Sequence, residues 1–142
     1  MIVKSILTTK GKNVITTTPE QTIKDVVILL DKYNIGALVV LDKKDEIAGI
    51  ISERDIIRRA ASQDDVLDRK VSDLMTTNVI TGLPQDDVKS VSNTMTAKRI
   101  RHLPITDGAK LVGIVSIGDV VKIQRDTALG EVDTLTTQIL AE

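Results

Sequence analysis

The stretch GIISERDIIR, residues 49–58, has a counterpart in GIVSIGDVVK, residues 113–122. Each copy contains a glycine, a β-branched run, a serine, two variable residues, an aspartate and an apolar pair. Ser116 follows Ser52 by 64 positions (116 − 52), and Asp119 follows Asp55 by the same number. An apolar run that ends in Ser-x-x-Asp is typical of a strand that leads directly into a capped helix. Two such units in one chain predict an internal repeat.

The repetition extends through most of the 142 residues. Residues 14–38 match residues 79–103 at an offset of 65, and VKSIL, residues 3–7, resembles VSDLM, residues 71–75. The one-residue slip falls where a turn would absorb it. We therefore divide the chain into a first repeat (residues 1–62), a linker (63–70), a second repeat (71–126) and a C-terminal helix (127–142).

Each repeat is predicted to have the order β-α-β-β-α, which is a mixed α/β (α+β) fold. A unit of about 60 residues buries little surface alone, so we expect the two to pack sheet against sheet with pseudo-twofold symmetry. The predicted strands are 13–16, 37–41 and 47–52 in the first repeat, and 78–81, 102–106 and 111–116 in the second. The predicted helices are 22–33 and 53–60, then 87–98 and 117–125.

The tail from Thr127 to Leu140 is predicted to form a further helix, with one apolar side made by Leu129, Val132, Leu135 and Ile139. That side would be buried in a homodimer or against the protein's own repeats.

Composition excludes several classes of function. With 19 basic and 20 acidic residues the net charge is −1, which favours neither nucleic acid nor an anionic membrane. Phe and Trp are absent, so aromatic stacking of bases is not available. Without cysteine there is no disulfide or thiol chemistry. We identify no signal peptide and no apolar run of membrane-spanning length, and expect a cytoplasmic protein that requires no metal.

The Ser-x-x-Asp motif has two interpretations. In the first it is a capping box, in which serine accepts a bond from a helix N–H and aspartate reaches back. In the second, the same helix start offers N–H groups and a positive dipole end to phosphate, while aspartate accepts bonds from sugar hydroxyls. One motif can do both.

The segment KRIRHLPI, residues 98–105, is the second candidate feature. Lys98 and Arg99 fit an ordinary helix C-terminus. Arg101 and His102 come just before an apolar strand, where basic residues favour a role in binding anions. No nucleophile or metal-ligand partner is spaced around His102, the chain's one histidine, so we do not expect an enzyme.

This ordered set of motifs, from IGALVVLD and GIISERDIIR to RIRHLPI and GIVSIGDVV, resembles a stand-alone tandem CBS-domain protein, also called a Bateman module. The resemblance covers about Val3 to Lys122. It implies two units paired through their sheets, association into a homodimer, and binding of an adenine nucleotide such as AMP, ATP or NAD(H) between the units. It also implies a regulatory protein that acts on a partner protein, which the sequence does not identify.

Residue by residue, the resemblance implies two clefts. In the first, Asp55 would hold ribose, phosphate would meet basic and hydroxyl side chains, and the adenine would lie between apolar ones; the residues are Ile50, Ser52, Arg54, Asp55, Thr81, Arg101, His102, Leu103 and Pro104. The second cleft would be formed by Thr16, Gly36, Ala37, Leu38, Ile114, Ser116, Gly118 and Asp119.

The two clefts are expected to differ in charge. Gly36 and Ala37 stand where the other repeat has Arg101 and His102, and Gly118 stands where the first repeat has Arg54. The cleft around Asp55 is therefore predicted to bind nucleotide phosphates better. The alternative to ligand binding is a structural or interaction dimer in which the Ser-x-x-Asp motifs are only caps.

Overall fold

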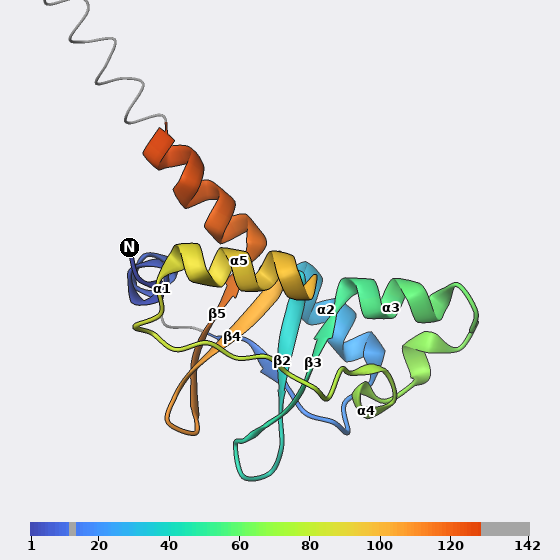
Figure 1. Cartoon of the computed structure of the whole chain (residues 1–142). Helices are drawn as coiled ribbons and strands as arrows, with labels where there is room; N and C mark the ends of the chain where they lie inside the picture. The colour runs from blue at the N-terminus through green and yellow to red at the C-terminus, as the bar shows by residue number, and fades with distance from the viewer. Residues whose placement is uncertain (12–13, 129–142) are drawn as a thin grey trace, which may run out of the picture.

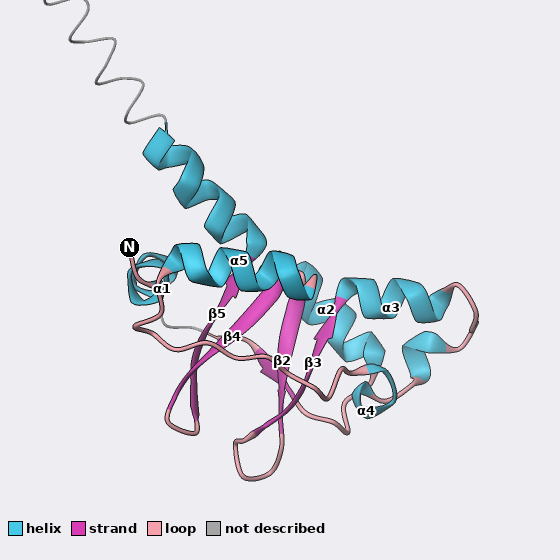
Figure 2. Cartoon of the chain, viewed as in Figure 1, coloured by secondary structure: helices cyan, strands magenta, loops and turns pink. Residues whose placement is uncertain are grey.

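Two β-hairpins form the centre of the molecule, with helices on their outer sides, in a computed structural model that describes residues 1–11 and 14–128 (Figure 1; Figure 2). The strands are β1 (Thr16–Thr17), β2 (Ala37–Leu41), β3 (Ile47–Ser52), β4 (His102–Asp107) and β5 (Lys110–Ser116). The helices are α1 (Val3–Lys10), α2 (Ile23–Tyr33), α3 (Glu53–Ala60), α4 (Val71–Leu74) and α5 (Val88–Lys98), with a 3-10 turn at Val66–Asp68. Residues 117–128 are also helical.

The predicted mixed fold with two sheets is confirmed, and the central hairpins and the helices beside them lie where the sequence places them. The helices α1 and α4 were not predicted from the sequence. Of the residues predicted to form the C-terminal helix (127–142), residues 127 and 128 are described and continue the helix that begins at residue 117, and residues 129–142 lie outside the described part of the chain.

One predicted strand is wrong. Residues 78–81 form no strand, and the second sheet contains only β4 and β5 within the described residues. In the first repeat, β1 pairs with β2 at Thr16↔Val39 and Thr17↔Val40. In the second repeat only the pair Gly82↔Ile105 forms. The residue equivalent to Val39 is Pro104, which has no N–H and cannot extend the ladder.

The two repeats exchange their N-terminal segments. Val3 and Ile6 of α1 are buried in the core of the second repeat, with Val91, Met95 and Leu103 among their neighbours there. The core of the first repeat instead contains Val66 of the linker and two residues of α4 at the start of the second repeat, Val71 and Leu74. The predicted linker is therefore partly a core element, and neither repeat has a complete core without a segment that precedes the other.

Backbone hydrogen bonds repeat this exchange with the predicted symmetry. Val71 N–H donates to Gln21 O (2.8 Å), and at the equivalent place Val3 N–H donates to Asp86 O (2.9 Å). The hydrogen bond between the start of each hairpin and the helix that follows it is also equivalent in the two repeats. Glu53 N–H donates to Gly36 O (2.9 Å), and Ile117 N–H donates to Arg101 O (2.8 Å).

Strand alternation shows that the sheets face each other. In β2, Leu38 and Val40 belong to the first core, which lies against the helices. Val39 points to the opposite face of β2 and is nevertheless fully buried. Its equivalent Pro104 is also buried. These inner positions are covered by the other sheet.

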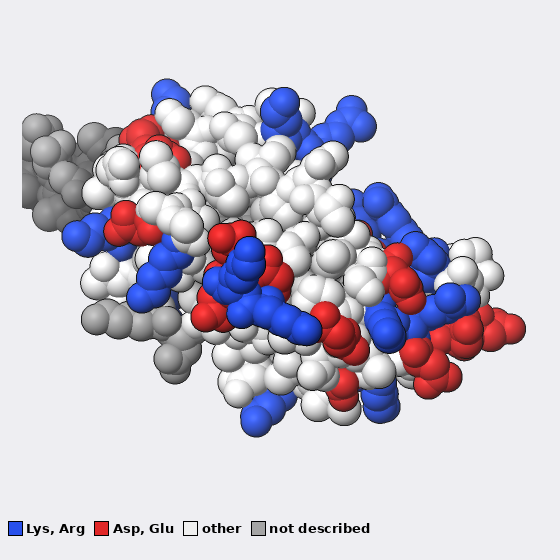
Figure 3. Space-filling view, turned by 90° about the horizontal axis from the view of Figure 1, so that it is seen from below, with Lys and Arg blue, Asp and Glu red and all other residues white. Residues whose placement is uncertain are grey.

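The surface carries no single-sign field on the face shown in Figure 3, where basic and acidic side chains are intermixed. Among the helices of the described residues, none has the length and apolar character needed to cross a membrane.

The close approach of α4 and the turn after it to β3 depends on Gly49. A Cβ at Gly49 would lie 2.7 Å from Thr76 O and 2.9 Å from Met75 Sδ. We predict that Gly49→Ala lowers the free energy of unfolding by about 1–3 kcal/mol, measured by urea denaturation, because a backbone atom must move. Gly118→Ala is the control, since its Cβ would meet nothing closer than Ser116 Oγ at 3.6 Å. Equal stabilities of the two variants would contradict this account.

Candidate functional site

Both Ser-x-x-Asp motifs form the same structure at the start of a helix. Ser52 N–H donates to Asp55 Oδ2 (2.9 Å) and Asp55 N–H donates to Ser52 Oγ (3.2 Å), which makes a complete capping box. In the second repeat the equivalent bonds are Ser116 N–H to Asp119 Oδ2 (2.8 Å) and Asp119 N–H to Ser116 Oγ (3.1 Å). Each carboxylate is thus fixed at the end of a strand. Each also lines a cleft.

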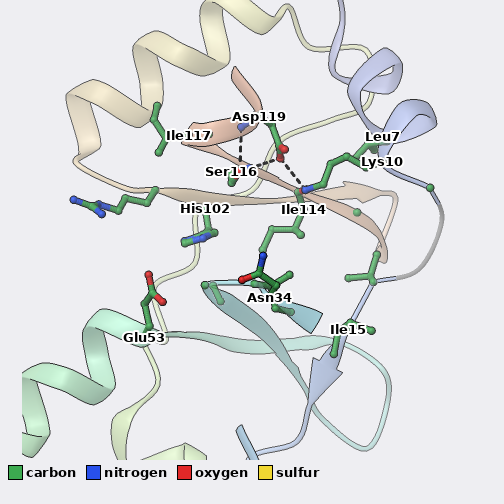
Figure 4. Close-up of a pocket in the computed structure, with 18 residues that line it drawn as sticks. Leu7, Lys10, Ile15, Asn34, Glu53, His102, Ile114, Ser116, Ile117 and Asp119 are labelled. Carbon is green, nitrogen blue, oxygen red and sulfur yellow. Dashed lines mark hydrogen bonds and ion pairs between the residues drawn. The ribbon is translucent and has the colours of Figure 1, made fainter. Parts of the chain in front are cut away.

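The larger cleft, here the Asp119 cleft, has a volume of about 480 Å³ (Figure 4). Its walls come from both repeats: the end of α1, the segment before β1, the start of β2, and the strand ends and helix start around Ser116. Of the predicted residues, Gly36, Ala37, Ile114, Ser116, Gly118 and Asp119 line it. The volume is within the range of about 300–1,000 Å³ that is usual for small-molecule sites.

Lys10 is a charged residue of this cleft that the sequence did not predict. Its ammonium donates to Asp119 Oδ2 at 2.7 Å and to Ile114 O at 2.9 Å (Figure 4). Burial alone would raise the pKa of Asp119, but the hydrogen bonds from Lys10 and Ser116 outweigh it, and the net effect is a lowered pKa. Asp119 is therefore a carboxylate at neutral pH, with its charge compensated by Lys10.

The smaller cleft, here the Asp55 cleft, has a volume of about 200 Å³. Of the predicted residues, Ile50, Ser52, Arg54, Asp55, Arg101 and His102 line it. Two guanidinium groups that the sequence did not predict also line it, those of Arg58 and Arg99. Thr76 forms part of its wall, and Thr76 N–H donates to Ile50 O at 2.9 Å.

Five predicted site residues line neither cleft. Leu38 and Leu103 are buried in the two cores, because each follows a cleft-facing residue in a strand and so points to the opposite face. Pro104 is buried, Thr16 is paired in β1, and Thr81 is exposed outside both clefts. Adenine contacts from Leu103 or Leu38 are therefore not available in this conformation.

The predicted charge difference between the clefts keeps its direction, because four arginines (Arg54, Arg58, Arg99 and Arg101) line the Asp55 cleft, whereas Lys10 and Arg101 are the positive side chains of the Asp119 cleft. The expectation that the Asp119 cleft lacks positive charge is wrong. Arg101 and His102 line both clefts, because the start of β4 lies where the two sheets meet. The Asp119 cleft thus has Arg101, His102 and Lys10, although the strand start that the first repeat contributes has glycine and alanine at the equivalent positions. Glu53 lines both clefts as well.

His102 lies near Glu53 at this junction (Figure 4), and Gly36 is its neighbour there. A Cβ on Gly36 would be 3.3 Å from His102 Nε2 and 3.4 Å from Glu53 Oε1. Burial lowers the pKa of His102 below the usual 6.5, against the opposing effect of Glu53. At neutral pH the ring is uncharged, so it is a hydrogen-bonding group rather than a cation.

Within residues 1–11 and 14–128, no group of three or more His, Asp or Glu side chains is placed to hold a metal ion.

Comparison with known proteins agrees with this architecture. The CBS-domain family model matches residues 3–62 and 71–126. The chain belongs to the CBS-domain family. It is 36% identical over 117 residues to the CBS domain-containing protein YhcV of Bacillus subtilis, covering 82% of this chain and 81% of YhcV. Pairs of CBS domains are regulatory modules.

Solved structures of CBS-domain proteins share the fold. The CBS-domain protein ATU1752 of Agrobacterium tumefaciens has a TM-score of 0.84 and 37% identity, with 87% of this chain and 99% of that one covered. The CBS domain pair of protein MJ0100, solved with 5′-methylthioadenosine and S-adenosyl-L-methionine, has a TM-score of 0.79 and 30% identity over 89% of this chain and 98% of that one.

The titration of His102 tests the environment at the junction of the clefts. Since it is the chain's one histidine, its ring resonances are unambiguous in a proton NMR titration. We predict a midpoint below 6.5 because burial disfavours the charged ring. A group whose pKa is depressed in the folded state binds its proton more readily when unfolded, so stability falls as pH drops below about 6.5.

The matching stability measurement compares the melting temperatures of the wild type and His102→Gln. Between pH 7.5 and 5.5 we expect the wild type to lose more stability than the variant. A midpoint at or above 6.5, or parallel losses, would contradict the account in which burial sets the pKa of His102.

Proposed function

We propose that this protein is a regulatory module that binds an adenosine-containing ligand, of the adenine nucleotide class, between its two repeats and signals the bound state to a partner protein. The Asp119 cleft is the main site. AMP, ATP and NAD(H) are the expected ligands, and no metal is required.

The observation that carries the proposal is the placement of Asp119. Its carboxylate is fixed by the helix cap, is partly buried, and lines a cleft of about 480 Å³ between the repeats. An ionised carboxylate accepts hydrogen bonds only, which suits the two hydroxyl donors of a ribose. The neighbouring wall is apolar, with Ile15, Ile35 and Ile114, and suits the flat faces of a purine.

The ligands of protein MJ0100 support the same class of ligand, since both contain adenosine. The Asp55 cleft has the same carboxylate but less than half the volume, at about 200 Å³. Its guanidinium groups suit phosphate. We propose it as a weaker site, or as one that widens when a ligand enters.

The competing function is a structural dimer in which the motifs only cap helices. The complete capping box at Ser52 is compatible with that function. A third capping box allows ligand binding to be distinguished from capping alone, because Thr22 and Asp25 at the start of α2 have the same arrangement outside both clefts. A change at Asp25 therefore measures the cost of a damaged cap alone.

We predict that AMP, ATP or NAD(H) at millimolar concentration raises the melting temperature. A ligand at roughly 100 times its Kd stabilises the fold by about 2.7 kcal/mol, a shift of several degrees. Asp119→Asn keeps an acceptor for the cap but loses the charge, so we expect ligand affinity to fall by roughly tenfold or more. Asp25→Asn is the matched control and should leave affinity unchanged.

Calorimetric titrations of the wild type, Asp55→Asn, Asp119→Asn and Asp25→Asn with AMP, ATP, NAD, NADH, 5′-methylthioadenosine and S-adenosylmethionine would decide the matter. Binding by none of them would leave the structural dimer as the function. Equal losses in Asp55→Asn and Asp119→Asn would contradict the order of the two clefts.

We also propose a homodimer. Ile57 of α3 and Val121 of the helix 117–128 are equivalent positions, and their side chains are 67% and 53% exposed. Light scattering should give about twice the 15.4 kDa of one chain. Ile57→Glu together with Val121→Glu should give the monomer mass. A monomeric wild type would overturn this proposal without affecting ligand binding.

A further inference from the structure

The ammonium of Lys10 joins three parts of the chain that are far apart in sequence. Lys10 ends α1, Asp119 lies in the first turn of the helix 117–128, and Ile114 is in β5. The two bonds, 2.7 Å to the carboxylate and 2.9 Å to the carbonyl, use two of the three N–H donors of an ammonium group. Within the described residues the third N–H has no acceptor, and Lys10 lines the cleft.

The Asp55 cleft has a backbone group where the Asp119 cleft has Lys10. The carbonyl oxygen of Ile50, the residue equivalent to Ile114, accepts a hydrogen bond from Thr76 N–H at 2.9 Å. The chain around Thr76 therefore runs along the edge of β3. In the second repeat a flexible side chain takes over that bond, which leaves more room and puts a positive charge at the cleft wall.

We propose that Lys10 makes the Asp119 cleft selective for adenosine ligands with an anionic group on the ribose, such as a 5′-phosphate, over neutral or cationic adenosine compounds. The inference rests on the proposed function and adds the charge of the ligand to it. It concerns a residue outside both Ser-x-x-Asp motifs.

Electrostatics gives two contributions of the same sign. The remaining N–H of Lys10 can donate to a phosphate oxygen while the ammonium still holds Asp119. Lys10 also compensates the charge of Asp119, which would otherwise repel a phosphate on the same ribose. A neutral adenosine compound gains from neither contribution, and a cationic one is repelled by the ammonium.

The probes are AMP and 5′-methylthioadenosine, which share adenine and ribose but differ in charge at the 5′ position. Lys10→Met keeps most of the aliphatic stem and removes the charge. We expect it to weaken AMP binding by roughly tenfold or more, as for the loss of a charge-assisted hydrogen bond. Binding of 5′-methylthioadenosine should change by less than about threefold, and S-adenosylmethionine should bind more tightly than to the wild type.

Two further variants control the measurement. Lys10→Arg retains the charge and should retain the preference for AMP. Lys4→Met removes a lysine from the same helix, and this residue lines neither cleft, so affinity for both probes should stay as in the wild type. The buried residues Val3 and Ile6 hold α1 in the second core, so Lys10→Met is expected to fold, which its melting temperature checks.

The possible outcomes distinguish a failure of the charge preference from a failure of the proposed ligand binding. If the wild type binds adenosine compounds and Lys10→Met changes the affinity for AMP and 5′-methylthioadenosine by the same factor, Lys10 only shapes the cleft and the inference is wrong. If AMP binding is unchanged in Lys10→Met, the inference is also wrong. If the wild type binds no probe at all, the proposed function itself fails.

Discussion

The exchange of N-terminal segments is the constraint on which the rest of this structure depends. Each repeat contributes two long strands and two helices, and this unit buries too little apolar surface to be stable alone. Its core is completed by a short helix that precedes the other repeat: α1 supplies Val3 and Ile6, and α4 supplies Val71 and Leu74. Separating the repeats would therefore open both cores at once. The clefts between the sheets are held in place by that mutual dependence.

The same exchange explains why the clefts differ although the repeats are alike. After α4 the chain turns at once, and Thr76 pairs with Ile50 along the edge of β3. The equivalent helix α1 is eight residues long instead of four, so it ends at Lys10 beyond the edge of β5. One cleft is therefore small and lined by guanidinium groups. The other is large and contains an ion pair. The asymmetry lies in the segments before the repeats rather than in the repeated motifs.

Much of the fold could be predicted because its signals are local. The hairpins follow from apolar runs such as GALVVL, and the helix starts follow from Ser52, Ser116 and Thr22, whose caps are visible in the sequence. The contribution of Arg101 to both clefts could not be predicted from the sequence, because this residue before β4 lines both clefts only once the sheets have packed. Lys10 pairs with a residue 109 positions away, and no motif surrounds it. The similarity of VKSIL to VSDLM was the available signal for the exchanged helices.

Local chemistry also set the one wrong strand. Pro104 occupies a position where the first repeat uses Val39, and the missing N–H is apparent from the letters RHLPI alone. For Leu38 and Leu103, by contrast, the sequence does not show which way the side chain points. Leu38 follows Ala37 and Leu103 follows His102, and only the register of the folded sheet decides which neighbour faces the cleft and which faces the core.

The start of β4 lines both clefts, so ligands bound as we propose would be coupled through it. If the guanidinium of Arg101 bound a phosphate in one cleft, it would no longer be available as a donor in the other. Thermodynamic linkage makes this effect reciprocal. If a ligand in one cleft lowers the affinity of the second cleft by some factor, a ligand in the second cleft lowers the affinity of the first by the same factor. A protein of this design would respond to the ratio of two competing anionic ligands rather than to the amount of either one.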